Sequence, residues 1–177
     1  MNEQTRLPRW RPASVAAREL PATLAPFLLE TGSLTRRLER ACGGRLWVRV
    51  VSQAWARPRA DEVRALGLPE GRWGLVRCVR LGCGGESWVY ARTVIPPQTL
   101  RGRLRRLAHL GERPLGAALF AEPAMSRGPL ELARLTPGMV LHADAGGGDG
   151  ERWARRSVFR LAGAPLLVCE IFNEEGP

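Results

Sequence analysis

The sequence contains no lysine, and all 27 of its basic residues are arginine. This absence excludes Schiff-base chemistry on a lysine, and with it the ordinary pyridoxal phosphate enzymes. The net charge of +10 could indicate a nucleic-acid binder. However, complete replacement of lysine by arginine is typical of a coding bias, and the arginines form no block denser than RRLER and RGRLRR. We therefore interpret the charge as a solvated basic surface and expect no nucleic-acid partner.

Metal-ligand motifs and long apolar runs are also missing. The two histidines and four cysteines show neither HExxH nor CxxC spacing, so no metal site is predicted. No apolar run approaches the roughly 20 residues that span a bilayer, and the N-terminus MNEQTRLPRWRP lacks the apolar core of a signal peptide. We expect a cytoplasmic protein without stable membrane insertion.

The four cysteines are scattered along the chain. Their spacing does not suggest a disulfide framework. Cys78 and Cys169 lie within apolar strands, and we predict that both are buried free thiols.

The length of 177 residues and the 45% hydrophobic content suit one domain, residues 1–177. Apolar patterns predict strands over 45–56, 73–81, 86–95, LELARL, WARRSVFRLAG and PLLVCEIFNE, with short helices over 20–30, 33–42, TLRGRLRRLAHLG and PLGAALFAE. Hairpins with helices grouped between them indicate an α+β fold, a largely antiparallel sheet of about six strands flanked by helices. Residues 1–8 and 173–177 are predicted as flexible ends, and residues 137–151, glycine-rich and acidic, as a loop insertion.

Three charged residues interrupt apolar strand faces. Strand side chains alternate between two faces, and Glu170 shares its face with leucine, valine and phenylalanine. Arg77 and Arg92 interrupt apolar faces of the two preceding strands in the same way. An unpaired buried charge costs several kcal/mol, so these groups need partners. A buried salt bridge of Glu170 with Arg77 or Arg92 and a closed anion-binding pocket explain the pattern equally well.

Four collinear segments resemble bacterial chorismate lyases of the ubiquinone pathway. They are GSLTRRLE, GESWVYARTVIP, ERPLGAALF and WARRSVFRLAGAPLLVCEIF, within a resemblance that runs from Leu7 to Phe172. The stretch from Leu135 to Glu151 looks longer than is usual for that family.

The resemblance implies an enzyme that converts chorismate to 4-hydroxybenzoate and pyruvate without cofactor or metal. It implies an enclosed ligand cavity under helical flaps. Because such a pocket would grip the carboxylate and the hydroxyl that the product keeps, we expect strong product retention; we also expect a monomer. The family's carboxylate-binding arginine falls on Arg77 and its hydroxyl-binding glutamate on Glu170. Two backbone contacts fall on Leu34 and Leu115. Arg92, in ARTV, would hold the enolpyruvyl carboxylate or stabilise charge on the departing oxygen.

One other class of protein fits the same pattern. Effector-binding domains of a family of bacterial transcription regulators share this fold and bind small anions or aromatic acids without chemistry. No winged-helix domain precedes the sheet in this sequence, and the set of Arg77, Arg92 and Glu170 also favours the enzyme.

Overall fold

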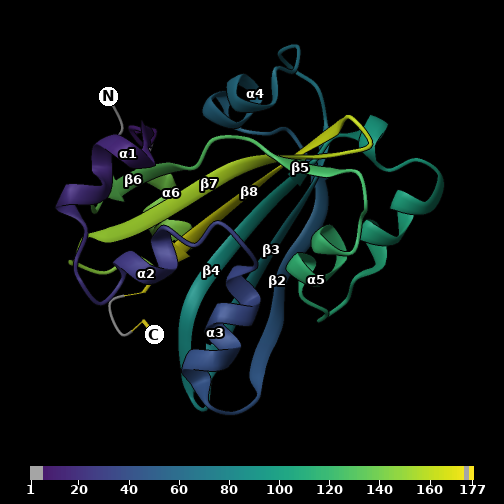
Figure 1. Cartoon of the computed structure of the whole chain (residues 1–177). Helices are drawn as coiled ribbons and strands as arrows, with labels where there is room; N and C mark the ends of the chain where they lie inside the picture. Colours follow the sequence, from purple (N-terminus) through teal and green to yellow (C-terminus); the bar gives the residue numbers. More distant parts are fainter. Residues whose placement is uncertain (1–5, 174–175) are drawn as a thin grey trace.

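The computed structural model describes residues 6–173 and 176–177. Its centre is an eight-stranded antiparallel sheet in the order β1-β6-β7-β8-β4-β3-β2, with β5 added on β7 (Figure 1). The strands are β1 Arg11–Pro12, β2 Leu46–Ala56, β3 Gly74–Cys83, β4 Glu86–Ile95, β5 Met125–Arg127, β6 Glu131–Leu135, β7 Arg152–Leu161 and β8 Ala164–Phe172. The α-helices are α1 Ala13–Ala16, α2 Ala25–Leu28, α3 Leu34–Cys42, α4 Ala60–Leu66, α5 Leu115–Phe120 and α6 Val140–Asp144. Three 3₁₀ helices complete the chain: η2 Ala17–Glu19, η3 Pro97–Thr99 and η4 Gly102–His109.

The α+β prediction is confirmed, and the six longer strands are the ones that the sequence pattern indicates. Two-residue turns close the β3–β4 and β7–β8 hairpins, as expected for glycine-rich connections. The two further strands, β1 and β5, have only two and three residues. They escape a pattern search because pairing with distant strands, rather than local alternation, defines them.

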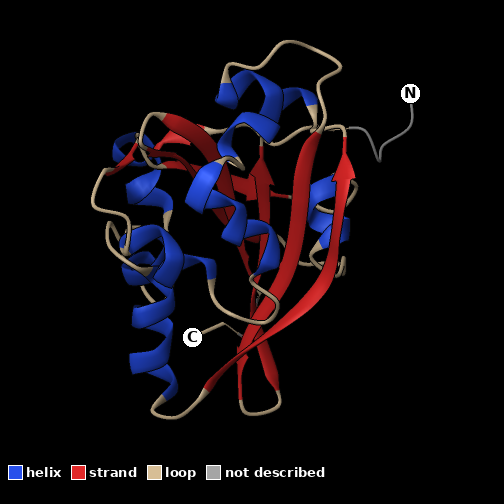
Figure 2. Cartoon of the chain, turned by 90° about the vertical axis from the view of Figure 1, so that its right-hand side faces the viewer, coloured by secondary structure: helices blue, strands red, loops and turns tan. Residues whose placement is uncertain are grey.

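Helices cover both faces of the sheet, so its central strands are buried on both sides (Figures 1 and 2). One face packs against α2, α3, α5 and η4, and the other packs against α4 and α6. β8 lies between β7 and β4. This central position explains why its sequence is apolar at both odd and even positions.

The helix α3 is the best example of local sequence control. Ser33 caps its start, where the Ser33 hydroxyl accepts a hydrogen bond from the Arg36 amide. Gly43 ends it in the left-handed conformation, with φ of 59°, which a glycine adopts without strain. Both boundaries follow from the sequence as predicted.

The prediction of a loop over 137–151 is wrong for its first half. α6 occupies Val140–Asp144, and its Leu141 packs in the cluster under α4. Apolar contacts therefore make a helix of a segment whose glycine content suggested none. At the ends, Arg6 bridges to Met139, and the Asn173 amide donates to the Ser87 carbonyl. These described parts of the ends are thus held to the domain, while residues 1–5 and 174–175 lie outside the described residues.

The cysteine predictions are half confirmed. Cys78 and Cys169 are buried free thiols, as expected. The absence of a disulfide, however, was a wrong prediction, because Cys42 and Cys83 form one with their Cα atoms 5.6 Å apart. The bond joins the last residue of α3 to the last residue of β3, two points that are 41 residues apart in sequence.

Candidate active site

A band of polar side chains crosses the sheet on the face covered by α2, α3 and α5. On β3, Arg77 lies between Leu75 of one apolar cluster and Val79 of another. On β8, Glu170 lies between Val168 and Phe172 of the same two clusters. The polar band therefore separates the apolar core of this face into two clusters.

The strand register brings the members of this band together. Thr93 of β4 pairs with Arg77 of β3, and Arg155 of β7 pairs directly with Glu170 of β8. Residues facing each other across strands point to the same side of a sheet. Arg77, Thr93, Glu170 and Arg155 consequently share one face, and all four line one cavity.

This cavity lies between the sheet and the starts of two helices. The space among its lining atoms is about 590 Å³, counting the part that opens to solvent. Leu34 and Thr35 of α3 and Leu115 and Gly116 of α5 contribute to the roof. A Cβ atom on Gly116 would lie 3.0 Å from the Thr35 hydroxyl oxygen, so the two helices approach closely at this point. Most of the remaining lining is apolar, which suits a flat ring with few polar substituents.

Arg77 is a deeply buried charge of the cavity, at 2% exposure. Its Nη2 donates to the Arg113 carbonyl at 3.2 Å, whereas its buried Nη1 has no hydrogen-bond partner. Burial lowers the pKa of the Arg77 guanidinium below its ordinary value, because the charged form loses solvation. Among the described residues, no carboxylate forms an ion pair with it. A guanidinium in this state is suited to bind an anion that enters from the cavity.

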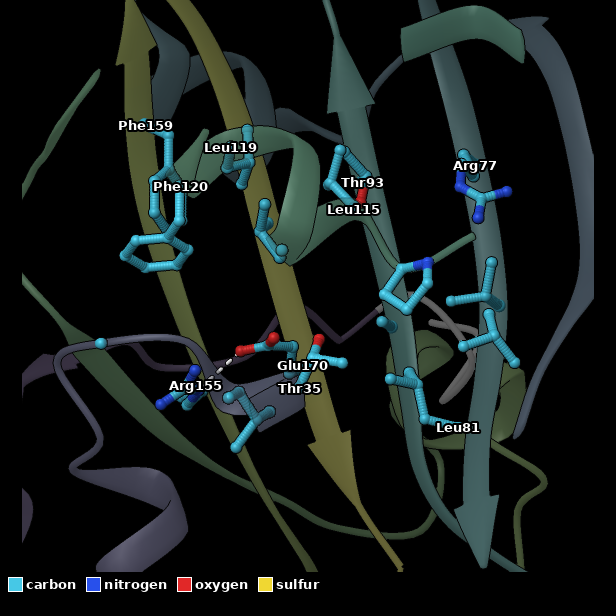
Figure 3. Close-up of a pocket in the computed structure, with 18 residues that line it drawn as sticks. Thr35, Arg77, Leu81, Thr93, Leu115, Leu119, Phe120, Arg155, Phe159 and Glu170 are labelled. Carbon is cyan, nitrogen blue, oxygen red and sulfur yellow. Dashed lines mark hydrogen bonds and ion pairs between the residues drawn. The ribbon is translucent and has the colours of Figure 1, made fainter. Parts of the chain in front are cut away.

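Glu170 faces the same cavity from the other side (Figure 3). Its Oε2 accepts a hydrogen bond from Arg155 Nε at 2.5 Å. The sequence left open a buried salt bridge or a ligand pocket for Glu170. Neither interpretation is complete, because Glu170 is in a salt bridge and also lines a cavity. Its partner is Arg155 rather than Arg77 or Arg92.

Arg92 does not belong to the cavity. Register pairs it with Cys78 of β3 and Cys169 of β8, which places it on the opposite face of the sheet. There its Nε donates to Glu62 of α4 at 2.6 Å and its Nη2 donates to the same carboxylate at 3.1 Å. Burial lowers the pKa of Arg92, but the hydrogen bonds and charge of Glu62 outweigh it and raise that pKa. The prediction that Arg92 points into the same interior as Arg77 and Glu170 is thus wrong.

The error has a physical cause. Alternation shows which residues of one strand lie on the same face as each other. When both faces of the sheet are buried, only the register between strands shows whether residues of two different strands share a face. The same test applied to WARRSVFRL would have found Arg155, which alternates with Trp153, Ser157 and Phe159 on one face. Arg155 is the site residue that the sequence interpretation missed.

The two residues predicted for backbone contacts lie where they can make them. Leu34 is the first residue of α3 and Leu115 is the first residue of α5, and both line the cavity. First-turn amide groups have no partner within their own helix. In the part of the chain that the structure describes, no group of three or more His, Cys, Asp or Glu side chains is placed to hold a metal ion.

Comparison with known proteins gives a consistent result. The family model described as chorismate lyase matches residues 8–175. A "Probable chorismate pyruvate-lyase" of Halorhodospira halophila is 46% identical over 94% of this chain and 90% of its own length. One of Methylococcus capsulatus with the same name is 48% identical over 82% of this chain and 91% of its own.

Among solved structures, the effector domain of PhnF from Mycobacterium smegmatis has a similar fold. The TM-score is 0.60, with 17% identity over 83% of this chain and 91% of that domain. A likeness at this level of identity concerns the fold alone. None of the helices in the described ranges is long and apolar enough to cross a membrane.

Proposed function

This chain belongs to the chorismate lyase family, and we propose that it is a chorismate pyruvate-lyase. It would convert chorismate to 4-hydroxybenzoate and pyruvate, the first committed step toward ubiquinone, without a cofactor. Its cytoplasmic location and its action as a monomer stay predictions from the sequence.

One observation supports this activity above the others. The guanidinium of Arg77, whose Nη1 has no hydrogen-bond partner, and the carboxylate of Glu170 lie on opposite sides of one largely apolar cavity (Figure 3). The product carries a carboxylate and a hydroxyl at opposite ends of a flat ring. We assign the ring carboxylate to Arg77 and the hydroxyl to Glu170. Leu34 and Leu115 would add main-chain hydrogen bonds from the roof.

The assigned groups fit a reaction that needs little covalent help from the protein. In chorismate, the C3–O bond to the enolpyruvyl group breaks while C4 loses its hydrogen, and the ring becomes aromatic. In a cyclic transfer, the C4 hydrogen moves to the enolpyruvyl methylene, and the ether oxygen becomes the ketone oxygen of pyruvate. Arg77 and Glu170 would hold the ring in the reactive conformer, so positioning and charge stabilisation supply the catalysis.

The same contacts predict strong product retention. 4-Hydroxybenzoate keeps both groups that Arg77 and Glu170 bind, and only the pyruvate moiety is lost. Release requires the roof to open, and we propose that the starts of α3 and α5 are the flaps. Their close approach at Gly116 and Thr35 supports this assignment.

A second candidate, carried over from the sequence, is a small-anion or aromatic-acid sensor without chemistry; the PhnF effector domain shares the fold, and the fold alone does not decide between the two. The decisive test is to incubate the protein with chorismate in the presence of a metal chelator and to measure 4-hydroxybenzoate and pyruvate. Equal amounts of both products support the lyase. Tight binding of 4-hydroxybenzoate with no turnover would support the sensor instead.

A further inference from the structure

Arg155 joins the ligand cavity to the chain segment that precedes a flap. Its side chain is only 3% exposed, and its Nε donates to Glu170. Its Nη1 donates to the carbonyl groups of Phe27 and Glu30, both at 2.8 Å. One guanidinium therefore binds a carboxylate of the cavity and two backbone carbonyls at the end of α2.

The contact fixes one half of the Glu170 carboxylate and leaves the other half available. Oε2 is engaged by Arg155. Within the described chain, no hydrogen bond engages Oε1, and the Glu170 side chain keeps 18% exposure on the cavity. A carboxylate held in this way presents one oxygen in a set direction. That oxygen is the natural acceptor for a ligand hydroxyl.

Of the two carbonyls that Arg155 binds, that of Phe27 lies in α2 and that of Glu30 lies in the link between α2 and α3, residues 29–33. Arg127 also binds this link, with its Nη1 donating to the carbonyls of Glu30 and Thr31 at 3.1 and 2.9 Å. Arg127 differs from Arg155 in the partner of its Nε. Its Nε donates to Ser157 rather than to Glu170. The link that leads directly into α3 is thus clamped by two arginines, of which one also holds Glu170.

We propose that Arg155 is a positioning residue that orients Glu170 toward the ligand hydroxyl and couples that carboxylate to the flap α3. The proposal rests on the proposed function only in its assignment of Glu170 to a ligand hydroxyl. A ligand that shifts the Glu170 carboxylate would therefore also shift Arg155 and the link before α3. Hydroxyl recognition and flap closure are then parts of one network.

Few other charged groups lie near Glu170, so the effect of Arg155 on this carboxylate can be measured separately. Arg127 acts on Glu170 through space without a hydrogen bond to it. On the neighbouring strand β4, the residue paired with Glu170 is the uncharged Ala91. Arg127 is therefore a matched control: it clamps the same link and carries the same charge, but it does not bind the carboxylate.

The test is the ratio of two affinities, for 4-hydroxybenzoate and for benzoate, in wild type, Arg155→Met and Arg127→Met. Both ligands carry the carboxylate for Arg77, so the ratio isolates the hydroxyl. A hydrogen bond to a charged group is expected to favour 4-hydroxybenzoate about tenfold or more in wild type. Arg155→Met should reduce this preference at least about fivefold, and Arg127→Met should leave it within about twofold. Both variants should release 4-hydroxybenzoate faster, because both loosen the link.

An unchanged preference in Arg155→Met would overturn the proposal, and so would an equal loss in Arg127→Met. If Arg155→Met does not fold, Arg155→Gln removes the charge while it keeps donors, and the same criterion applies. The ratio requires no turnover, so it is independent of the lyase assay. A protein that cleaves chorismate but fails this test keeps its proposed function and loses only the role of Arg155.

Discussion

Arg92 and Glu62 form a two-point ion pair on the face of the sheet opposite the cavity, with both side chains largely buried. Glu62 also caps α4, where its Oε2 accepts a hydrogen bond from the Arg59 amide at 2.8 Å. The pair therefore holds α4 to the centre of the sheet. We therefore expect its role to be in stability, although Arg92 lies within the stretch that the chorismate lyase family model matches.

Arg92→Met should therefore destabilise the protein without weakening the binding of its ligand. Removal of one partner from a buried pair costs about 3–5 kcal/mol of unfolding free energy, which urea unfolding would measure. The double variant Arg92→Met/Glu62→Met should recover most of this loss, because no uncompensated charge remains. A large loss of 4-hydroxybenzoate affinity at near-normal stability would return Arg92 to the site.

The link before α3 should respond to acid through Glu30. Its carboxylate accepts hydrogen bonds from the Gly32 amide at 2.7 Å and from Arg37 at 3.0 Å. Chiefly the Gly32 contact holds the pKa of Glu30 below its ordinary value of 4.5, against the effect of burial. Because the folded pKa is the lower one, this stabilisation is complete above about pH 4.5 and is lost as the pH falls through the folded pKa.

Glu30→Gln should remove this part of the pH dependence. The difference in unfolding free energy between wild type and variant should be largest near neutral pH and should shrink in acid. Glu39→Gln, an exposed change on α3, serves as the control. A constant difference across the whole pH range would show that the Glu30 contacts do not depend on its charge.

Gly116→Ala should speed product release. The new Cβ would lie 3.0 Å from the Thr35 hydroxyl oxygen, so the Thr35 side chain or the start of a helix must give by a few tenths of an ångström, which loosens the contact between α3 and α5. We expect the release rate of 4-hydroxybenzoate to rise severalfold in a stopped-flow displacement measurement. Adding Thr35→Ala removes the opposing hydroxyl and should restore slow release. A release rate that Gly116→Ala leaves unchanged would exclude this contact as part of the flap.

Reducing agents should destabilise the fold. The Cys42–Cys83 disulfide closes a loop of 41 residues, for which chain entropy predicts about 4 kcal/mol of stabilisation. A variant with both cysteines changed to serine should be as unstable as the reduced protein and should not respond to reductant.

Thiol titration provides the control: unfolded, non-reduced protein should show two reactive thiols, Cys78 and Cys169. Burial raises the pKa of Cys169 well above its ordinary value, so its thiol should react slowly in the folded state. Four reactive thiols without reductant would contradict the disulfide.

The sequence predicts the fold well where local signals define it. Caps at Ser33 and Gly43 delimit α3, and glycine turns delimit both long hairpins. Long-range relationships were less accessible. The disulfide joins cysteines that the pairing of β2 with β3 brings together, because Leu46, four residues after Cys42, pairs with Cys83. Likewise, α6 forms because its apolar side packs under a distant helix.

The candidate site shows the same difference between local signals, which the sequence reveals, and long-range relationships, which it does not. Alternation identified Arg77 and Glu170, because each interrupts an otherwise apolar face of one strand. It could not place Arg92, because the phase between two strands depends on a register that no single strand reveals. Arg155 carried the same local signal as Glu170, and the sequence interpretation overlooked it.

The most direct test of the whole account is a crystal structure with 4-hydroxybenzoate bound. The account predicts that the ring fills the cavity, with a carboxylate oxygen within about 3 Å of Arg77 Nη1. The hydroxyl should lie at the same distance from the oxygen of Glu170 that Arg155 does not hold. A ligand bound in the reverse orientation, or outside this cavity, would contradict the assignment of both residues.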